Sequence, residues 1–125
     1  MSLSSSRSIS YVYVTDRARG VAFYRDTLGL PHVEADDFGD AFDLGGSTMR
    51  LTALPDHKPT GHPALGWSVS DVADTLRALK ARGIEPLIYE GMGQDADGIW
   101  TAPGGRTRLA WFSDPDGNAL MLSED

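Results

Sequence analysis

The chain has 125 residues, with 18 acidic and 11 basic side chains, a formal net charge of −7 and 41% hydrophobic residues. This length and apolar content fit one compact domain and exclude wholesale disorder. The acidic balance excludes nucleic acid and anionic membrane surfaces as partners, because both need basic protein surface. With no cysteine, the chain has no disulfide, thiolate nucleophile or cysteine–zinc site.

No apolar run reaches the roughly 18 residues that span a bilayer. Residues 1–8 are rich in serine and lack the apolar core of a signal peptide. We expect this segment to be a disordered lead-in, and a cytoplasmic location is the default expectation.

The first half of the chain predicts one strand, one helix and three further strands. Residues 9–14 are β-branched and aromatic, which is typical of a strand. Asp16 is a candidate N-cap for a helix whose apolar residues continue to Leu28, and Gly29 is placed to end it. Further strands are predicted at 32–36, 40–44 and 48–54, the last two joined by a turn at Gly45-Gly46-Ser47.

The second half repeats this order after a Pro-rich linker at 55–63. A strand is predicted from Ala64 to Val69, and Asp71 caps a helix that Gly83 closes. Three more strands are predicted at 85–89, 107–112 and 118–123. The last two flank the turn sequence Asp114-Pro115-Asp116-Gly117-Asn118.

Two alignments indicate a duplicated unit. Ile9 stands as far before Asp16 as Ala64 stands before Asp71, and DLGGSTMRLT (43–52) aligns with DPDGNALMLS (114–123). The sequence therefore predicts an α+β domain over 9–124, made of two βαβββ modules (9–54 and 64–124) that form a curved mixed sheet around a central cavity.

One helix can cover only one face of each half-sheet, so the other face is predicted to line a trough that binds a small ligand. Strand alternation directs Val12, Val14, Met49 and Leu51 toward the helix. The predicted trough-facing residues are Tyr11, Tyr13, Arg50, Thr52, Ser68 and Met121. Trp111 and Phe112 cannot share a face, and alternation does not decide which of them lines the cavity.

The segments VAFYRDTLGL (21–30) and AWFSDPDGNALML (110–122) resemble the vicinal oxygen chelate superfamily. That group includes glyoxalase I, extradiol dioxygenases, fosfomycin-resistance enzymes and bleomycin-resistance binding proteins. The resemblance spans 9–124 and implies the paired βαβββ fold, a small-molecule site and a homodimer.

Metalloenzymes of this superfamily hold a divalent ion at positions that correspond here to Ile9, Arg50, Ala64 and Met121. None of these is a usable ligand, so we expect neither a metal nor another cofactor. One alternative is a shifted site that uses His62. Another is weak Ca²⁺ binding by Asp36, Asp37, Asp40 and Asp43. The simpler interpretation is that these acids, and the three histidines His32, His57 and His62, lie in solvated loops.

Arg50 has two interpretations. It receives an anionic or carbonyl group of a ligand, or it forms a salt bridge with a neighbouring acid. Tyr11 and Tyr13 would offer ring surface to an aromatic ligand, although packing in a core or an interface explains them equally well. Trp111 completes the candidate ligand-binding residues.

The sequence thus predicts a metal-free protein of the bleomycin-resistance type that sequesters or carries a small aromatic or anionic compound. The alternative is an enzyme, a lyase, isomerase or dioxygenase, with a displaced divalent-metal site or with Arg50 acting electrostatically. The ligand and the existence of any reaction stay open.

Overall fold

The computed structural model describes residues 2–125. The chain divides into two compact units, one running to Lys58 and the other spanning Pro59–Asp125. The boundary lies within the Pro-rich segment 55–63. A single domain over 9–124 and disorder of residues 1–8 remain predictions, as does a cavity enclosed by both modules.

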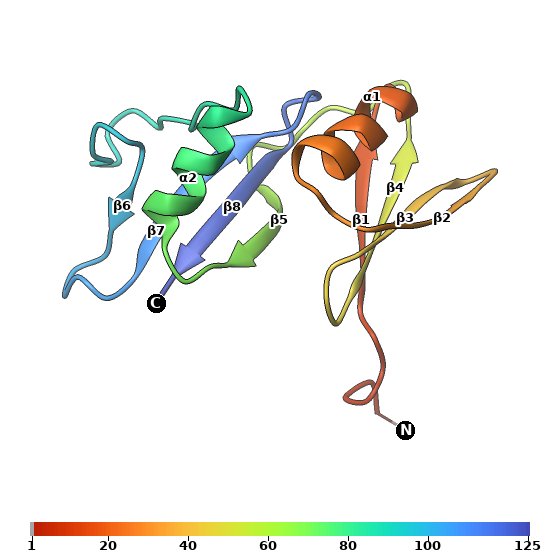
Figure 1. The fold of residues 1–125 in the computed structure, drawn as a ribbon, viewed down its shortest axis with the longest axis horizontal. Helices are drawn as coiled ribbons and strands as arrows, with labels where there is room; N and C mark the ends of the chain where they lie inside the picture. Colours follow the sequence, from red (N-terminus) through yellow and green to blue (C-terminus); the bar gives the residue numbers. More distant parts are fainter. Residues whose placement is uncertain (1) are drawn as a thin grey trace. The chain divides into compact units, whose positions relative to one another are not determined.

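Unit 1 is a four-stranded mixed sheet with one helix (Figure 1). Its strands follow the order β1-β4-β3-β2, with β1 parallel to β4 and the other neighbours antiparallel. The elements are β1 (Ile9–Val14), α1 (Arg17–Ala22) continued by the π-helical turn η1 (Phe23–Thr27), β2 (His32–Asp36), β3 (Gly39–Asp43) and β4 (Thr48–Ala53).

Unit 2 repeats this topology, with the strand order β5-β8-β7-β6 and with β5 parallel to β8. Its elements are β5 (Pro63–Ser68), α2 (Val72–Ala81), β6 (Trp100–Thr101), β7 (Arg108–Ser113) and β8 (Ala119–Glu124). Both units therefore contain the strand–helix–three-strand order that the sequence predicted, and the α+β fold class is confirmed.

Both helices begin at the predicted aspartate caps. The Asp16 side chain accepts a hydrogen bond from the Arg19 N–H at 3.1 Å, and Asp71 does the same for the Asp74 N–H at 3.0 Å. The first helix ends in a wider turn, because the Leu28 N–H bonds to the Phe23 carbonyl, five residues back, at 2.9 Å. None of the helices in residues 2–125 is long and apolar enough to cross a membrane.

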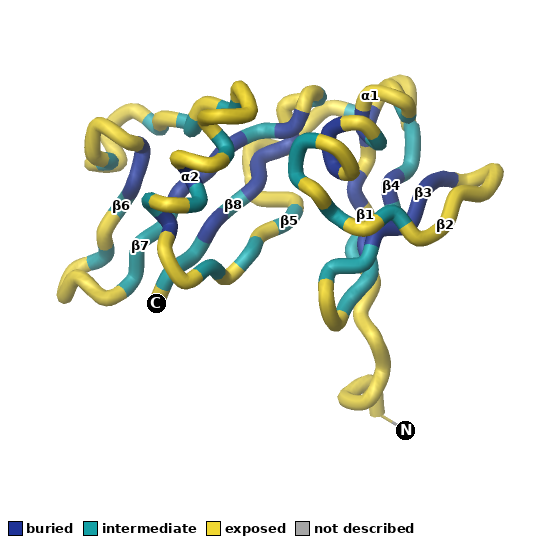
Figure 2. Tube along the Cα trace, in the orientation of Figure 1, coloured by how far each residue is buried: buried dark blue, intermediate teal, exposed yellow. Residues whose placement is uncertain are grey.

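The core of each unit lies between its helix and one face of its sheet (Figure 2). In unit 1, Val14 and Leu51 are fully buried. Gly20 of α1 lies directly over them, because a Cβ at this position would be only 3.0 Å from Val14 Cγ2. The corresponding core of unit 2 contains Phe112, Leu120, Leu122, Val72 and Leu76.

The strand predicted at 85–89 is wrong. The outer strand of unit 2 is β6, which has two residues. The Gln94 side chain forms hydrogen bonds with the backbone of segment 85–89. It accepts from the Tyr89 N–H at 2.7 Å and donates to the Leu87 carbonyl at 2.9 Å. Pro86 supplies no backbone N–H to a ladder. The apolar residues that suggested a strand therefore lie in an irregular segment, which is held by the Gln94 side chain and by a hydrogen bond from the Leu87 N–H to the Trp111 carbonyl at 2.7 Å.

The turn predicted at 114–118 is confirmed. Asp114 Oδ1 accepts hydrogen bonds from the backbone N–H groups of Asp116 and Asn118, both at 2.9 Å. Asn118 donates its side-chain amide to Asp114 Oδ2 at 2.8 Å. Because both residues are buried, these bonds fix the reversal between β7 and β8 from inside the protein.

Candidate functional site: an aromatic face beside a paired arginine

In unit 1, the sheet face opposite α1 carries exposed aromatic side chains. Tyr11 is 58% exposed and Tyr13 is 37% exposed, while the alternate residues Val12 and Val14 are buried under the helix. In the register of β1 with β4, Tyr11 stands beside Arg50 and Tyr13 stands beside Thr52. We call this surface the aromatic face; it also includes Glu34, which lies in the same row as Arg50 through Ala41.

Arg50 on the aromatic face is paired with a carboxylate. Its Nη2 donates to Asp36 Oδ1 at 3.0 Å and to Asp36 Oδ2 at 3.1 Å. The side chain of Arg50 is 20% exposed. The hydrogen bond to Asp36 raises the pKa of Arg50, and the bond from Arg50, followed by the Phe38 N–H, lowers the pKa of Asp36. The salt-bridge interpretation of Arg50 is therefore the one that the geometry supports.

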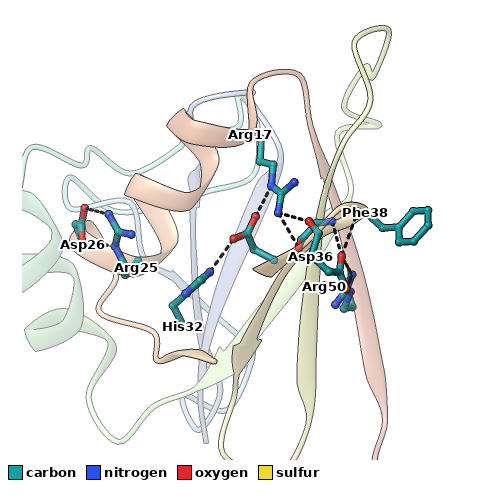
Figure 3. Close-up of polar contacts among 9 residues, drawn as sticks. Arg17, Arg25, Asp26, His32, Asp36, Phe38 and Arg50 are labelled. Atoms are coloured by element: carbon teal, nitrogen blue, oxygen red, sulfur yellow. Dashed lines mark hydrogen bonds and ion pairs between the residues drawn. The ribbon is translucent and has the colours of Figure 1, made fainter. Parts of the chain in front are cut away.

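Asp36 also organises the tip of the β2–β3 hairpin. Its Oδ1 accepts from the Phe38 N–H at 2.8 Å and from the Gly39 N–H at 3.0 Å. The Phe38 ring is 80% exposed and points away from this cluster (Figure 3). The carboxylate that neutralises Arg50 is thus fixed by the hairpin itself, and its position follows from the local turn.

A second polar cluster, which the sequence analysis missed, lies on the helix side of the same hairpin (Figure 3). Arg17 Nε donates to Asp40 Oδ1 at 2.6 Å, and His32 Nε2 lies 2.7 Å from Asp40 Oδ2. The same arginine donates through Nη2 to the Asp36 carbonyl at 2.7 Å and to the Gly39 carbonyl at 2.9 Å. The two faces of the hairpin are therefore held by different arginines.

The interpretation as solvated loop residues is wrong for His32, Asp36, Asp40 and Asp43, whereas Asp37 is exposed in the turn between β2 and β3. Asp36, Asp40 and Asp43 each bond to an arginine. Asp43 pairs with Arg7 at 2.7 Å. The three arginines are distant in the sequence from these acids: Arg7 precedes β1, Arg17 begins α1 and Arg50 lies on β4.

Unit 2 decides which aromatic residue shares a face with Met121. Trp111 pairs in register with Met121, while Phe112 pairs with Leu120. Phe112 stacks on Trp67 with ring centroids 6.2 Å apart, whereas Trp111 meets Tyr89 edge-on at 5.5 Å. Trp111 is thus on the face opposite the core, although it is only 6% exposed. Ser68 is exposed on β5, beside Ser123.

The predicted site residues therefore form two groups. The first group comprises Tyr11, Tyr13, Arg50 and Thr52 on neighbouring strands of unit 1. The second comprises Ser68, Met121 and Trp111 on neighbouring strands of unit 2.

The residues at the four metal-ligand positions do not fit a metal ion. Ile9 and Ala64 have no donor atom, and Met121 offers only a thioether. Arg50 would bring a positive charge to the ion. Within residues 2–125 there is also no group of three or more His, Asp or Glu residues placed to hold a metal ion.

The chain belongs to the Glyoxalase/Bleomycin resistance protein/Dioxygenase superfamily, whose family model matches residues 8–122. This agrees with the resemblance carried by the segments 21–30 and 110–122. A search of curated proteins found no significant match.

Solved structures show the same fold. A superfamily member from Sphaerobacter thermophilus is 22% identical, with a TM-score of 0.75 and coverage of 97% of this chain and 98% of that one. A fosfomycin resistance protein from Listeria monocytogenes is 16% identical, with a TM-score of 0.74 and coverage of 97% and 93%. A lactoylglutathione lyase from Agrobacterium tumefaciens is 22% identical, with a TM-score of 0.64 and coverage of 96% and 93%.

Proposed function

We propose that this protein is a metal-free small-molecule binding protein of the glyoxalase/bleomycin-resistance type, and that the aromatic face of unit 1 contacts the ligand. The observation that carries the proposal is the exposure of Tyr11 and Tyr13 beside Arg50. Exposed ring faces next to a guanidinium offer stacking surface and hydrogen-bond donors together. Thr52 adds a hydroxyl in the same row as Tyr13.

Within unit 2, we propose Met121 and Ser68 as ligand contacts on that unit's own sheet. Trp111 is buried beneath Tyr89, so we assign it the role of supporting that surface. We also propose that the protein is a cytoplasmic homodimer; sedimentation equilibrium at micromolar concentration and cell fractionation would test these two points.

Fragment binding to the intact protein tests the proposed function. We expect aromatic fragments to shift the NMR signals of Tyr11, Tyr13 and Arg50, and we expect Tyr11→Ala and Tyr13→Ala each to weaken binding about tenfold. Phe38→Ala is the matched control, because Phe38 is an exposed aromatic residue at the hairpin tip. A library that produces no shifts on the aromatic face, or equal losses in all three variants, would contradict the proposal.

An enzymatic role is the second candidate, because a structure with this fold is a lactoylglutathione lyase. Such an enzyme would need a displaced divalent-metal site or would use Arg50 electrostatically. Elemental analysis of protein purified without chelator distinguishes the metal-dependent form from the binding protein. One equivalent of a divalent metal retained through dialysis would overturn the metal-free proposal.

A further inference from the structure

Building on the proposed function, we infer that the aromatic face takes an uncharged aromatic compound that carries a carbonyl or similar neutral oxygen acceptor. This replaces the broader expectation of an aromatic or anionic ligand. Charge balance at Arg50, the N–H groups that Asp36 does not engage and the neighbouring acid carry the inference.

The positive charge of Arg50 is already neutralised within the protein. Both oxygens of Asp36 lie within hydrogen-bond distance of Nη2, at 3.0 and 3.1 Å. Asp36 is in turn held by the Phe38 and Gly39 N–H groups. A ligand carboxylate would have to compete for Arg50 with the Asp36 carboxylate, which is already held in place. An anionic ligand therefore gains little binding free energy from this guanidinium.

The surroundings of the pair are acidic. Glu34 is exposed and lies in the same row of the sheet as Arg50, and it acts electrostatically on the guanidinium. One cation and two carboxylates therefore leave this part of the face with excess negative charge, on a chain whose net charge is −7. An anionic ligand is repelled at short range and also at longer range.

Arg50 nevertheless keeps donors for a ligand. A guanidinium has five N–H groups, on Nε, Nη1 and Nη2. Both hydrogen bonds to Asp36 leave from Nη2, so the N–H groups of Nε and Nη1 are not engaged by Asp36. A charged donor forms a strong hydrogen bond with a neutral oxygen. A cationic ammonium or amidinium group has no acceptor for these N–H donors, so it cannot form this hydrogen bond.

Asp36 is thus a positioning residue that sets both the orientation and the effective charge of Arg50. Tyr11 is the neighbour of Arg50 in register, so a ring lying on Tyr11 brings a ring substituent close to the guanidinium. A planar ring with a carbonyl group matches these two contacts at once.

Three probes of the same shape test this inference: 2-naphthamide, 2-naphthoate and 2-naphthamidine, which at pH 7 are neutral, anionic and cationic. Each is titrated into ¹⁵N-labelled full-length protein, with the Tyr11, Tyr13 and Arg50 Nε–H signals as the readout. We expect the amide to bind about fivefold more tightly than either charged probe, a difference of about 1 kcal/mol.

Asp36→Asn separates charge from structure. Asparagine keeps an Oδ1 that can accept from the Phe38 and Gly39 N–H groups, so the hairpin is retained while the negative charge is lost. We expect the ratio of naphthoate to naphthamide affinity to rise about tenfold in this variant. Asp37→Asn is the matched control, because it makes the same change in net charge at the adjacent exposed position and should leave the ratio unchanged.

The outcomes are distinct. Tighter binding of the naphthoate or the naphthamidine by the unsubstituted protein overturns this inference and leaves the proposed function standing. An unchanged ratio in Asp36→Asn, or the same change in Asp37→Asn, also overturns it. If none of the three probes shifts the Tyr11 and Tyr13 signals, the proposed function fails, and this inference fails with it.

Discussion

At Asp40, a carboxylate that is only 4% exposed lies between Arg17 and His32. Burial raises the pKa of Asp40, but the hydrogen bonds from His32 and Arg17 outweigh burial, so the pKa falls below its ordinary value. The charged form of Asp40 is therefore stabilised in the folded protein. Arg17 and His32 each form a hydrogen bond with this carboxylate.

We expect Asp40→Asn to lower the free energy of unfolding by about 2 kcal/mol. An amide can accept one hydrogen bond, but its NH₂ group then faces a second donor. Urea denaturation with a tryptophan fluorescence readout measures the loss. Asp37→Asn, at an exposed position of the same hairpin, is the control, and an equal effect in both variants would contradict the role given to Asp40.

Among the elements, the β2–β3 hairpin depends on a glycine at one position, residue 39. Gly39 has a φ of 157°, and a Cβ there would collide with the backbone carbonyl oxygen of Leu51. This close approach brings Asp36 to Arg50 and places the Gly39 carbonyl near Arg17. The hairpin tip therefore depends on the absence of a side chain at this position.

Gly39→Ala should destabilise the protein by about 3 kcal/mol, because strain in φ is combined with a backbone collision. Gly46→Ala is the matched control: φ is 139° and nothing lies within 4 Å of the added Cβ. We expect it to cost about 1 kcal/mol, from the dihedral angle alone. Equal losses in chemical denaturation would show that the collision with Leu51 is not important.

The N-cap of α2 gives a second prediction at this scale. Asp71 accepts from the Asp74 N–H at 3.0 Å. Replacement by alanine leaves that donor without its cap and should cost about 1 kcal/mol, whereas asparagine should retain most of the stability. Thermal unfolding followed by circular dichroism compares the two variants, and an asparagine variant as unstable as the alanine variant would argue against capping.

At the scale of the whole molecule, four aspartates have a pKa below the ordinary value. The pKa of Asp26 and Asp36 is lowered below 3.8, first by hydrogen bonds from Arg25 and Arg50 respectively. The pKa of Asp43 is lowered by the Gly45 N–H and then by Arg7. Asp40 completes the set. Each group binds a proton less readily in the folded chain than in the unfolded chain.

The sign of the pH dependence follows from these directions. The stability that these carboxylates contribute is fully present above their unfolded pKa, near 3.8, and is lost as the pH falls through their lower folded pKa values. We therefore expect the free energy of unfolding to decrease steadily below about pH 4. Denaturation between pH 2 and 7 measures it, and a flat profile below pH 4 would contradict the pairing of these acids.

The sequence by itself determined the secondary-structure order and its duplication. Asp16 and Asp71 mark helix starts through local hydrogen bonds, and alternation correctly buried Val12 and Val14 while exposing Tyr11 and Tyr13. These features depend on neighbours in the chain. The predicted 85–89 strand failed because Gln94 bonds that backbone, a contact that strand periodicity does not encode.

Only the tertiary structure decided the state of Arg50. Its identity and its place in the sheet were evident from the sequence, but its partner Asp36 lies on another strand and is brought near by the antiparallel pairing of β2, β3 and β4. The pairing of β2 with β3 also brings His32 to the buried Asp40, and Arg17 reaches the same carboxylate from α1. The charge that a ligand meets depends on such non-local pairs, because electrostatic energy is set by distance in space.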